Sequence, residues 1–308
     1  MKDITFDILN KYKIRKSARQ KIDFETYIKK SLESYNLKIT VEESGLIKSR
    51  NIIIGDISKA QVIIGAHYDT CAVLPFPNII TPQRMWIYIL YQVLLASAMI
   101  VASAAFAFIT ELLIKNHYIS IAVYVAVLLS LIFLLIFGKA NKNNYNDNTS
   151  GVITVVQTAL KLEEQYKYKA AFVLFDNEEK GLLGSMQFAK KHKADLKDKA
   201  LINLDCVSDG DNILIIPDKH FKADCVLIDK LKSVFISTNE KNIIISEKKY
   251  FYPSDQMSFK KTLGIASMKY SKILGLYMDK IHTAKDTVFD ERNITLLTDS
   301  LINFIKII

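Results

Sequence analysis

Five residues spread over most of the chain have side chains suited to binding two metal ions. They are His67, Asp147, Glu179, Asp205 and His282. Two ions about 3.5–4 Å apart need a bridging carboxylate, with further nitrogen and oxygen ligands on each ion. Imidazole and carboxylate donors suit zinc, and manganese or cobalt remain alternatives. The residue types make a metal-dependent hydrolase the leading interpretation.

Several of these candidates follow short apolar runs that are typical of buried strands. One such run ends at His67, another precedes the pair Glu178 and Glu179, and a third ends at Asp205. In a mainly parallel sheet, functional side chains gather at the carboxyl ends of the strands. We therefore expect these side chains to meet at one edge of a sheet.

The remaining candidates lie in polar loops. Asp147 opens an Asp-Asn-Thr-Ser-Gly sequence ahead of a helical pattern, and His282 opens His-Thr-Ala-Lys-Asp-Thr. Asp69 is two residues after His67, and Asp286 is four residues after His282. Each of these acids can accept a hydrogen bond from the second ring nitrogen of its histidine and fix the tautomer.

The adjacent acids Glu178 and Glu179 allow a division of labour. One carboxylate can bind a metal ion while its neighbour takes a proton from a water molecule that the ions activate. Metal binding lowers the pKa of water from 15.7 toward about 7, so a glutamate base is sufficient.

Each motif taken alone has an ordinary interpretation. The Glu178-Glu179 pair resembles a solvated surface pair, and His282 an ordinary loop histidine. Asp147 or Thr149 would serve as a helix cap. The joint occurrence of all the motifs, in order along one chain, favours the metal site.

Two further stretches are apolar on every face and long enough to cross a membrane. Residues 86–110 and 118–137 carry no formal charge, and about 20 helical residues span a hydrocarbon core of about 30 Å. We expect a transmembrane hairpin at residues 84–138, closed by a loop at 111–117. Two buried helices of a soluble protein are the alternative interpretation.

Aromatic and small residues agree with a hairpin. Trp86, Tyr88 and Tyr91 are placed as interfacial anchors near one end, with Tyr118 and Tyr124 near the turn. Small side chains recur on one helical face, where a second helix could approach closely. They belong to Ala98, Ala102 and Ala105.

A hairpin returns the chain to the side of the membrane that it left. Residues 1–83 and 139–308 are thus expected to form one discontinuous domain in a single compartment. Arg84, Lys139 and Lys142 flank the outer ends of the hairpin, and this excess of positive charge indicates a cytoplasmic domain. We expect a multi-pass protein of the cell membrane, with the lipid bilayer as a partner.

Composition agrees with this location. The net charge of +9 has no concentrated basic block, and no motif for nucleic-acid binding accompanies it. The three cysteines are far apart in sequence, which favours a reducing compartment over a disulfide scaffold. Residues 1–30 lack the apolar core of a signal peptide. The sequence leaves the oligomeric state open.

The rest of the chain alternates between strand and helix patterns, which indicates an α/β fold with a mixed, mainly parallel central sheet flanked by helices. Strands are predicted at 37–41, 51–54, 61–66, 169–175, 200–205, 212–216, 242–246 and 264–270. Helices are predicted at 3–35, 149–164, 182–191, 223–234 and 292–308.

Taken in order, these motifs resemble the di-zinc exopeptidases of metallopeptidase family 28, the bacterial leucyl aminopeptidase type. Relatives of that family include glutamate carboxypeptidase and glutaminyl cyclase. The matching stretches are His67-Tyr68-Asp69-Thr70, Asp147-Asn148-Thr149-Ser150-Gly151, Phe175 to Ser185, Asn203-Leu204-Asp205 and Ile281 to Thr287. The resemblance covers essentially the whole non-hairpin part of the chain.

The resemblance implies a role for each matching residue. His67 and Asp205 would hold one zinc ion, and Glu179 and His282 the other. Asp147 would bridge both ions. Glu178 would be the general base, and Asp69 would orient His67.

The implied reaction is hydrolysis of the peptide bond next to a free amino terminus, with peptide or protein N-termini as substrates. Carboxypeptidase and glutaminyl cyclase activities are alternatives on the same scaffold, and a non-catalytic membrane adaptor is a third. A transporter is disfavoured because neither apolar stretch contains an internal charge.

Two features depart from the family pattern. Members usually have a short loop between the His-Tyr-Asp motif and the bridging aspartate, whereas here the hairpin is inserted there. This insertion predicts membrane-proximal peptide substrates. The second departure is Gln256, which stands where the family often has a histidine.

Overall fold

The computed structural model describes residues 2–248 and 250–308. Its centre is one mixed sheet in the order β1-β2-β4-β3-β5-β8-β6-β7, with β9 paired to β8. The neighbours β4, β3, β5 and β8 are parallel, while β1, β2 and β6 add antiparallel pairings. This confirms the expected α/β class. The strands are β1 (Ile39–Ser44), β2 (Ser49–Ile54), β3 (Val62–His67), β4 (Ala170–Phe175), β5 (Ala200–Leu204), β6 (Asn212–Pro217), β7 (Asn242–Ile245), β8 (Thr262–Ser271) and β9 (Gly275–Tyr277).

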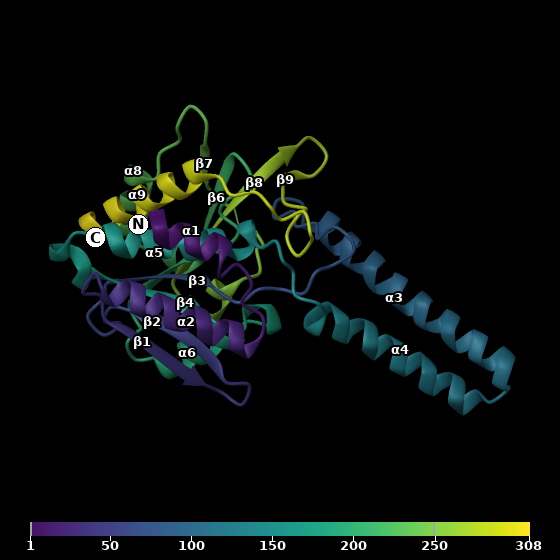
Figure 1. Cartoon of the computed structure of the whole chain (residues 1–308). Coiled ribbons are helices and arrows are strands. Elements are labelled where there is room, and N and C mark those ends of the chain that lie inside the picture. Colours follow the sequence, from purple (N-terminus) through teal and green to yellow (C-terminus); the bar gives the residue numbers. More distant parts are fainter. Residues whose placement is uncertain (1, 249) are drawn as a thin grey trace.

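The central strands are buried on both faces. Every residue of β3, β4 and β5 is buried, because helices cover the sheet on both sides (Figure 1). Helices α1, α2, α5, α8 and α9 pack on one face, and α6 packs on the other. The helices of this domain are α1 (Lys2–Asn10), α2 (Ala18–Glu33), α5 (Gly151–Lys161), α6 (Leu183–Lys191), α7 (Lys219–Ala223), α8 (Cys225–Val234) and α9 (Glu291–Ile307).

The prediction of one continuous helix over 3–35 is wrong. The chain leaves α1 at Asn10 and starts α2 at Ala18. Ser17 begins the second helix with a capping box, in which its side chain accepts from the Gln20 backbone and the Gln20 side chain accepts from the Ser17 backbone. The intervening segment carries Arg15 toward the edge of the sheet where the candidate ligands lie.

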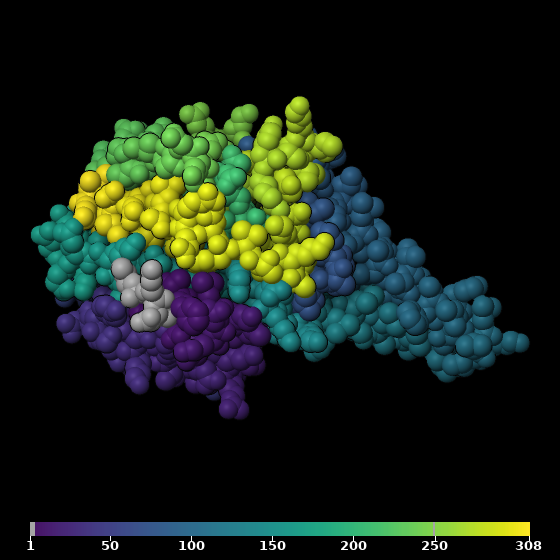
Figure 2. All heavy atoms as spheres, turned by 45° about the horizontal axis from the view of Figure 1, so that its top comes forward, coloured from purple at the N-terminus to yellow at the C-terminus, as the bar shows by residue number. Residues whose placement is uncertain are grey.

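Two long helices project from the domain as a hairpin, which Figure 2 shows as an extension from the rounded body. They are α3 (Met85–Ile114) and α4 (His117–Phe137). Both are long and apolar enough to cross a membrane, with mean hydropathies of 2.3 and 3.0, and only 6% of each apolar window is buried. The connecting loop is shorter than predicted, because Asn116 caps α4 directly after Lys115.

Candidate active site

Three neighbouring parallel strands bring candidate ligands to one edge of the sheet. His67 is the last residue of β3, the Glu178–Lys180 turn follows β4, and Asp205 follows β5. Strands β4, β3 and β5 are adjacent in that order. The expectation that these side chains gather at the carboxyl ends of strands is therefore met by the geometry.

Asp147 lies between the two histidines. Its Oδ1 atom is 3.2 Å from Nε2 of His67, and its Oδ2 atom is 3.0 Å from Nε2 of His282. The two oxygens of one carboxylate thus face two different imidazoles. This is the arrangement that a carboxylate bridging two ions requires.

Each histidine also faces a second acid. Nε2 of His67 is 3.5 Å from Oδ1 of Asp205, and Nε2 of His282 is 3.4 Å from Oε2 of Glu179. Two histidine–carboxylate pairs therefore share Asp147. Sequence reasoning predicted these five residues, and the structure brings all of them together.

The Asp147 loop is fixed to the end of β5 by the neighbouring asparagines. The side chain of Asn148 donates to the Leu204 carbonyl and accepts from the backbone N–H groups of Gly151 and Cys206. A Cβ on Gly151 would lie 2.5 Å from the Leu204 carbonyl oxygen, so only glycine permits this approach. Asn148, and neither Asp147 nor Thr149 of the alternative helix-cap interpretation, thus accepts from the first residue of α5.

Asp286 has a different role from the predicted one. Its carboxylate accepts hydrogen bonds from the backbone N–H groups of Asn146 and Asp147, at 2.9 and 3.0 Å. It therefore holds the Asp147 backbone, and no hydrogen bond to the His282 ring is present among the described residues. Burial and the nearby charge of Asp147 raise the pKa of Asp286 to about 8.

Asp69 connects two of the ligand segments. Its carboxylate accepts from the backbone N–H groups of Glu178 and Glu179, at 3.0 and 3.2 Å. The nearest acceptor for Nδ1 of His67 is the main-chain carbonyl of Asp69 at 3.2 Å, with its carboxylate at 3.6 Å. Asp69 thus lies where it can orient His67, and it also fixes the turn that carries both glutamates.

The electrostatics of the cluster favour positive charge between its acids. Burial alone would lower the pKa of His282, but Glu179 and Asp147 raise it to about 9. Burial likewise opposes charge on His67, yet Glu178, Asp147 and Asp205 raise the pKa of His67 well above its usual value. A site that stabilises cations at both imidazoles is suited to divalent metal ions.

A buried oxygen supports the same conclusion. The Glu179 side chain is 8% exposed, and its Oε1 atom has no hydrogen-bond partner among the described residues. An unsatisfied buried carboxylate oxygen is costly, and a cation beside it would satisfy it. The imidazole and carboxylate donors therefore fit zinc in identity as well as in position.

Glu178 lies beside both half-sites. Ligand atoms of His67, Glu178 and Glu179 lie within 4.8 Å of one another. Burial raises the pKa of Glu178 well above its usual value, and the charge of Glu179 adds to the rise while His67 opposes it. A carboxylate in this position can hold and release a proton.

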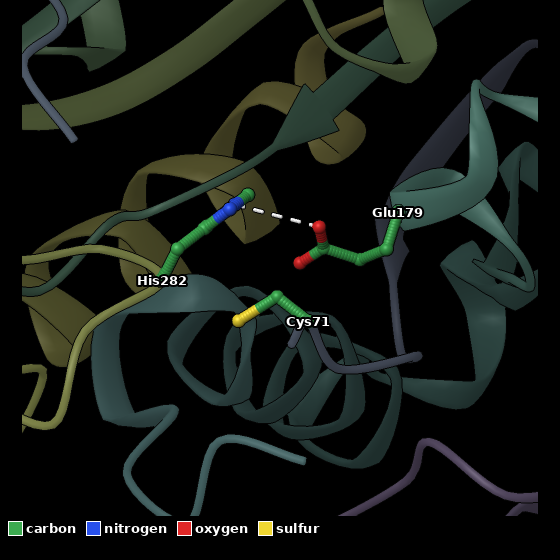
Figure 3. Close-up of side chains that lie close together, drawn as sticks. All are labelled: Cys71, Glu179 and His282. Atoms are coloured by element: carbon green, nitrogen blue, oxygen red, sulfur yellow. Dashed lines mark ion pairs between the residues drawn. The ribbon is translucent and has the colours of Figure 1, made fainter. Parts of the chain in front are cut away.

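Cys71 is a member of the cluster that sequence reasoning missed. Its thiol lies within 4.8 Å of ligand atoms of Glu179 and His282, and Figure 3 shows these three side chains approaching one another from separate segments. The thiol is buried, and burial raises its pKa well above the usual value. Its position four residues after His67, in the same loop, was the available signal.

Gln256, which departs from the family pattern, is held by two hydrogen bonds. It accepts from the Asn203 side chain at 2.8 Å and donates to the Tyr252 carbonyl at 2.6 Å. The adjacent Asp255 is fully buried, and neither of its carboxylate oxygens has a partner among the described residues. Burial raises the pKa of Asp255 to about 7.

Comparisons with known proteins agree with this fold. Residues 112–304 match the model described as peptidase family M28. No curated protein matches the chain significantly.

Solved structures cover nearly the whole chain. The glutaminyl cyclase of Porphyromonas gingivalis superimposes with a TM-score of 0.63 at 14% identity, covering 99% of this chain and 97% of that one. The LapA aminopeptidase of Legionella pneumophila gives 0.60 at 14% identity, covering 99% and 70%. At this identity the likeness concerns the fold, which hosts both activities.

Proposed function

This chain belongs to peptidase family M28, and we propose that it is a membrane-anchored, zinc-dependent aminopeptidase. It would hydrolyse the peptide bond next to a free amino terminus. The observation that carries the proposal is the position of Asp147 between two histidine–carboxylate pairs. That geometry supports two adjoining cation sites that would share one ligand.

The residues divide into two ligand sets. His67 and Asp205 would hold one zinc ion, Glu179 and His282 the other, and Asp147 both. Bound zinc supplies Lewis-acid polarisation of the scissile carbonyl and lowers the pKa of a water molecule. Manganese or cobalt would use the same donors.

Glu178 would act as the general base. Its raised pKa suits a carboxylate that takes a proton during attack on the carbonyl and returns it to the leaving amine. Asp69 would keep Glu178 in place, because it accepts the backbone N–H of that residue at 3.0 Å.

The contacts of Arg15 support an amino-terminal substrate over a carboxyl-terminal one. The guanidinium of Arg15 is close, but it is fully buried and donates to the carbonyls of Tyr12 and Tyr68 and to Thr149. It is therefore already engaged and leaves no free fork for a substrate C-terminus.

The hairpin supports a membrane location. Helices α3 and α4 are long, apolar and largely unburied, and basic residues lie at their domain ends. Lys16 donates to the carbonyl of Ile136 at 2.7 Å, and Arg84 donates to the carbonyls of Lys272 and Ile273. We place the domain in the cytoplasm, next to the bilayer.

The decisive experiment compares substrates for three activities with purified protein, with and without a chelator. Aminoacyl amides and dipeptides report aminopeptidase activity, N-blocked peptides report carboxypeptidase activity, and peptides with N-terminal glutamine report cyclisation. We expect release of the N-terminal residue that stops with the chelator. Glu178→Gln should lower kcat by about 10²–10⁴-fold.

Other outcomes identify the alternatives. Cyclisation of glutamine with release of ammonia would replace the proposal by a glutaminyl cyclase. Release of C-terminal residues would indicate a carboxypeptidase. Turnover of none of these substrates by metal-loaded protein would favour a non-catalytic adaptor.

A further inference from the structure

The base of the hairpin contains a large apolar cavity that reaches the candidate active site. Its volume is about 870 Å³, and its walls come from α3, α4 and the loop that follows β3. His282 is one of the lining residues, so the cavity adjoins the cluster through a candidate metal ligand.

The cavity is elongated along the hairpin. Its α3 wall extends from Tyr88 to Ala102, which corresponds to about 21 Å of helix. An extended peptide covers that distance with about six residues. Ala98 and Ala102, whose small side chains were expected to allow close helix approach, both line the cavity. Their small side chains leave room between the helices.

The lining changes in character from the helices to the domain. Leucine and alanine dominate the helix walls, including Leu95, Leu131 and Leu135, whereas His282 and Lys139 contribute polar groups from the domain side. A molecule that fits this cavity is apolar along most of its length and polar where it meets the cluster.

We propose that the cavity binds an apolar segment of the peptide substrate, joined to the terminal residue that is cleaved. This inference rests on the proposed aminopeptidase function and specifies its substrate class as hydrophobic peptides. The cavity meets the cluster at His282, so a molecule that fills it lies against the proposed site of peptide-bond cleavage, which favours a peptide over a phospholipid.

The test narrows the cavity without touching the cluster. Ala102→Trp places a large ring in the cavity, and Ala98→Leu is a milder variant in case the first perturbs folding. Val101→Trp is the matched control, because Val101 is 66% exposed and is not part of the lining. Each is compared with wild type in detergent micelles on three substrates: leucine p-nitroanilide, Leu followed by six apolar residues and two lysines, and Leu followed by six polar residues and two lysines.

We expect the wild type to prefer the apolar peptide over the polar peptide by at least about 10-fold in kcat/KM, since burial of one large apolar side chain contributes about that factor. Ala102→Trp and Ala98→Leu should reduce this preference about 10-fold or more. The kcat/KM for the anilide should stay within about twofold of the wild-type value. Val101→Trp should change none of the three.

A binding measurement tests the cavity independently of catalysis. The fluorescently labelled apolar peptide should bind the Glu178→Gln variant, and Ala102→Trp in that background should weaken the binding about 10-fold. An unchanged Kd, or an equal loss of affinity for the apolar and polar peptides, would overturn the inference. Hydrolysis of the anilide by the wild type would still support the proposed aminopeptidase. If the wild type cleaved neither anilide nor peptides, the proposed function itself would fail, and the inference with it.

Discussion

Asp147 combines burial with permanent charge. Burial alone would raise its pKa, but hydrogen bonds from His282 and His67 hold the pKa of Asp147 well below the usual range. Asp286 fixes its backbone by accepting the Asp147 N–H at 3.0 Å. The carboxylate is thus ionised and positioned before any ion arrives, as a bridging ligand should be.

Asp147→Asn should separate metal binding from proton transfer. The amide is neutral and offers one oxygen in place of two, so it cannot bridge. We expect zinc content after dialysis to fall from two equivalents toward one or none, as elemental analysis would measure it. Glu178→Gln should retain both ions and lose activity. Equal zinc content in wild type and Asp147→Asn would contradict the assignment of a bridging role.

Cys71 adds a soft donor to a cluster of hard and intermediate donors. Thiolates bind cadmium more strongly than serine hydroxyls do. We expect Cys71→Ser to weaken cadmium binding about 10-fold or more in competition titrations, with a smaller effect on manganese. The control is Cys225→Ser, because Cys225 is exposed and distant in sequence. Equal cadmium affinity in the two variants would show that the Cys71 thiol does not reach the ion.

At the scale of elements, the segment between α1 and α2 ties the N-terminal helices to the active-site loops. Arg15 is fully buried and donates to Tyr12, Tyr68 and Thr149. Two of these acceptors lie in the His67 loop and the Asp147 loop. One side chain therefore fixes these two loops relative to each other.

Loss of this guanidinium should destabilise the domain. Arg15→Met keeps the apolar stem but leaves buried carbonyls without donors, so the free energy of unfolding should fall by about 3 kcal/mol. Urea titration monitored by circular dichroism measures the change. Arg19→Met removes an exposed arginine and should change stability by less than about 0.5 kcal/mol. Similar values for the two variants would mean that Arg15 is not a structural tie.

Local sequence patterns predicted most elements because apolar runs and helical periodicity are local signals. Strands β3, β4 and β5 begin and end within two residues of their predicted positions. The prediction of one helix at 3–35 was wrong because the apolar periodicity continues across the break between α1 and α2. Ser17 and Gln20 carry the capping-box pattern that marks the start of the second helix.

The sequence predicted which residues gather at the candidate site, but it did not predict the contacts that support them. His67, Glu178 and Asp205 follow strands, so their gathering depends only on strand direction. Asp286 and Cys71 depend on how loops cross above the sheet, which no local pattern records. The contacts of Asp286 and Cys71 therefore follow from the three-dimensional structure alone.

At the scale of the molecule, the hairpin is an apolar extension of a peptidase fold. It is inserted between β3, which carries His67, and the Asp147 loop. We expect full-length protein to float with liposomes and to resist extraction by high salt and carbonate. Replacing residues 84–138 with a short linker should release the domain into the soluble fraction. Extraction of the full-length protein by salt alone would contradict a transmembrane hairpin.

The central claim is that the chain folds to place two metal ions on either side of Asp147. Anomalous diffraction from zinc-loaded crystals, recorded above and below the zinc absorption edge, tests this directly. We expect two peaks about 3.5–4 Å apart, one beside His67 and Asp205 and the other beside Glu179 and His282. An absence of anomalous density at Asp147 in fully loaded crystals would contradict it.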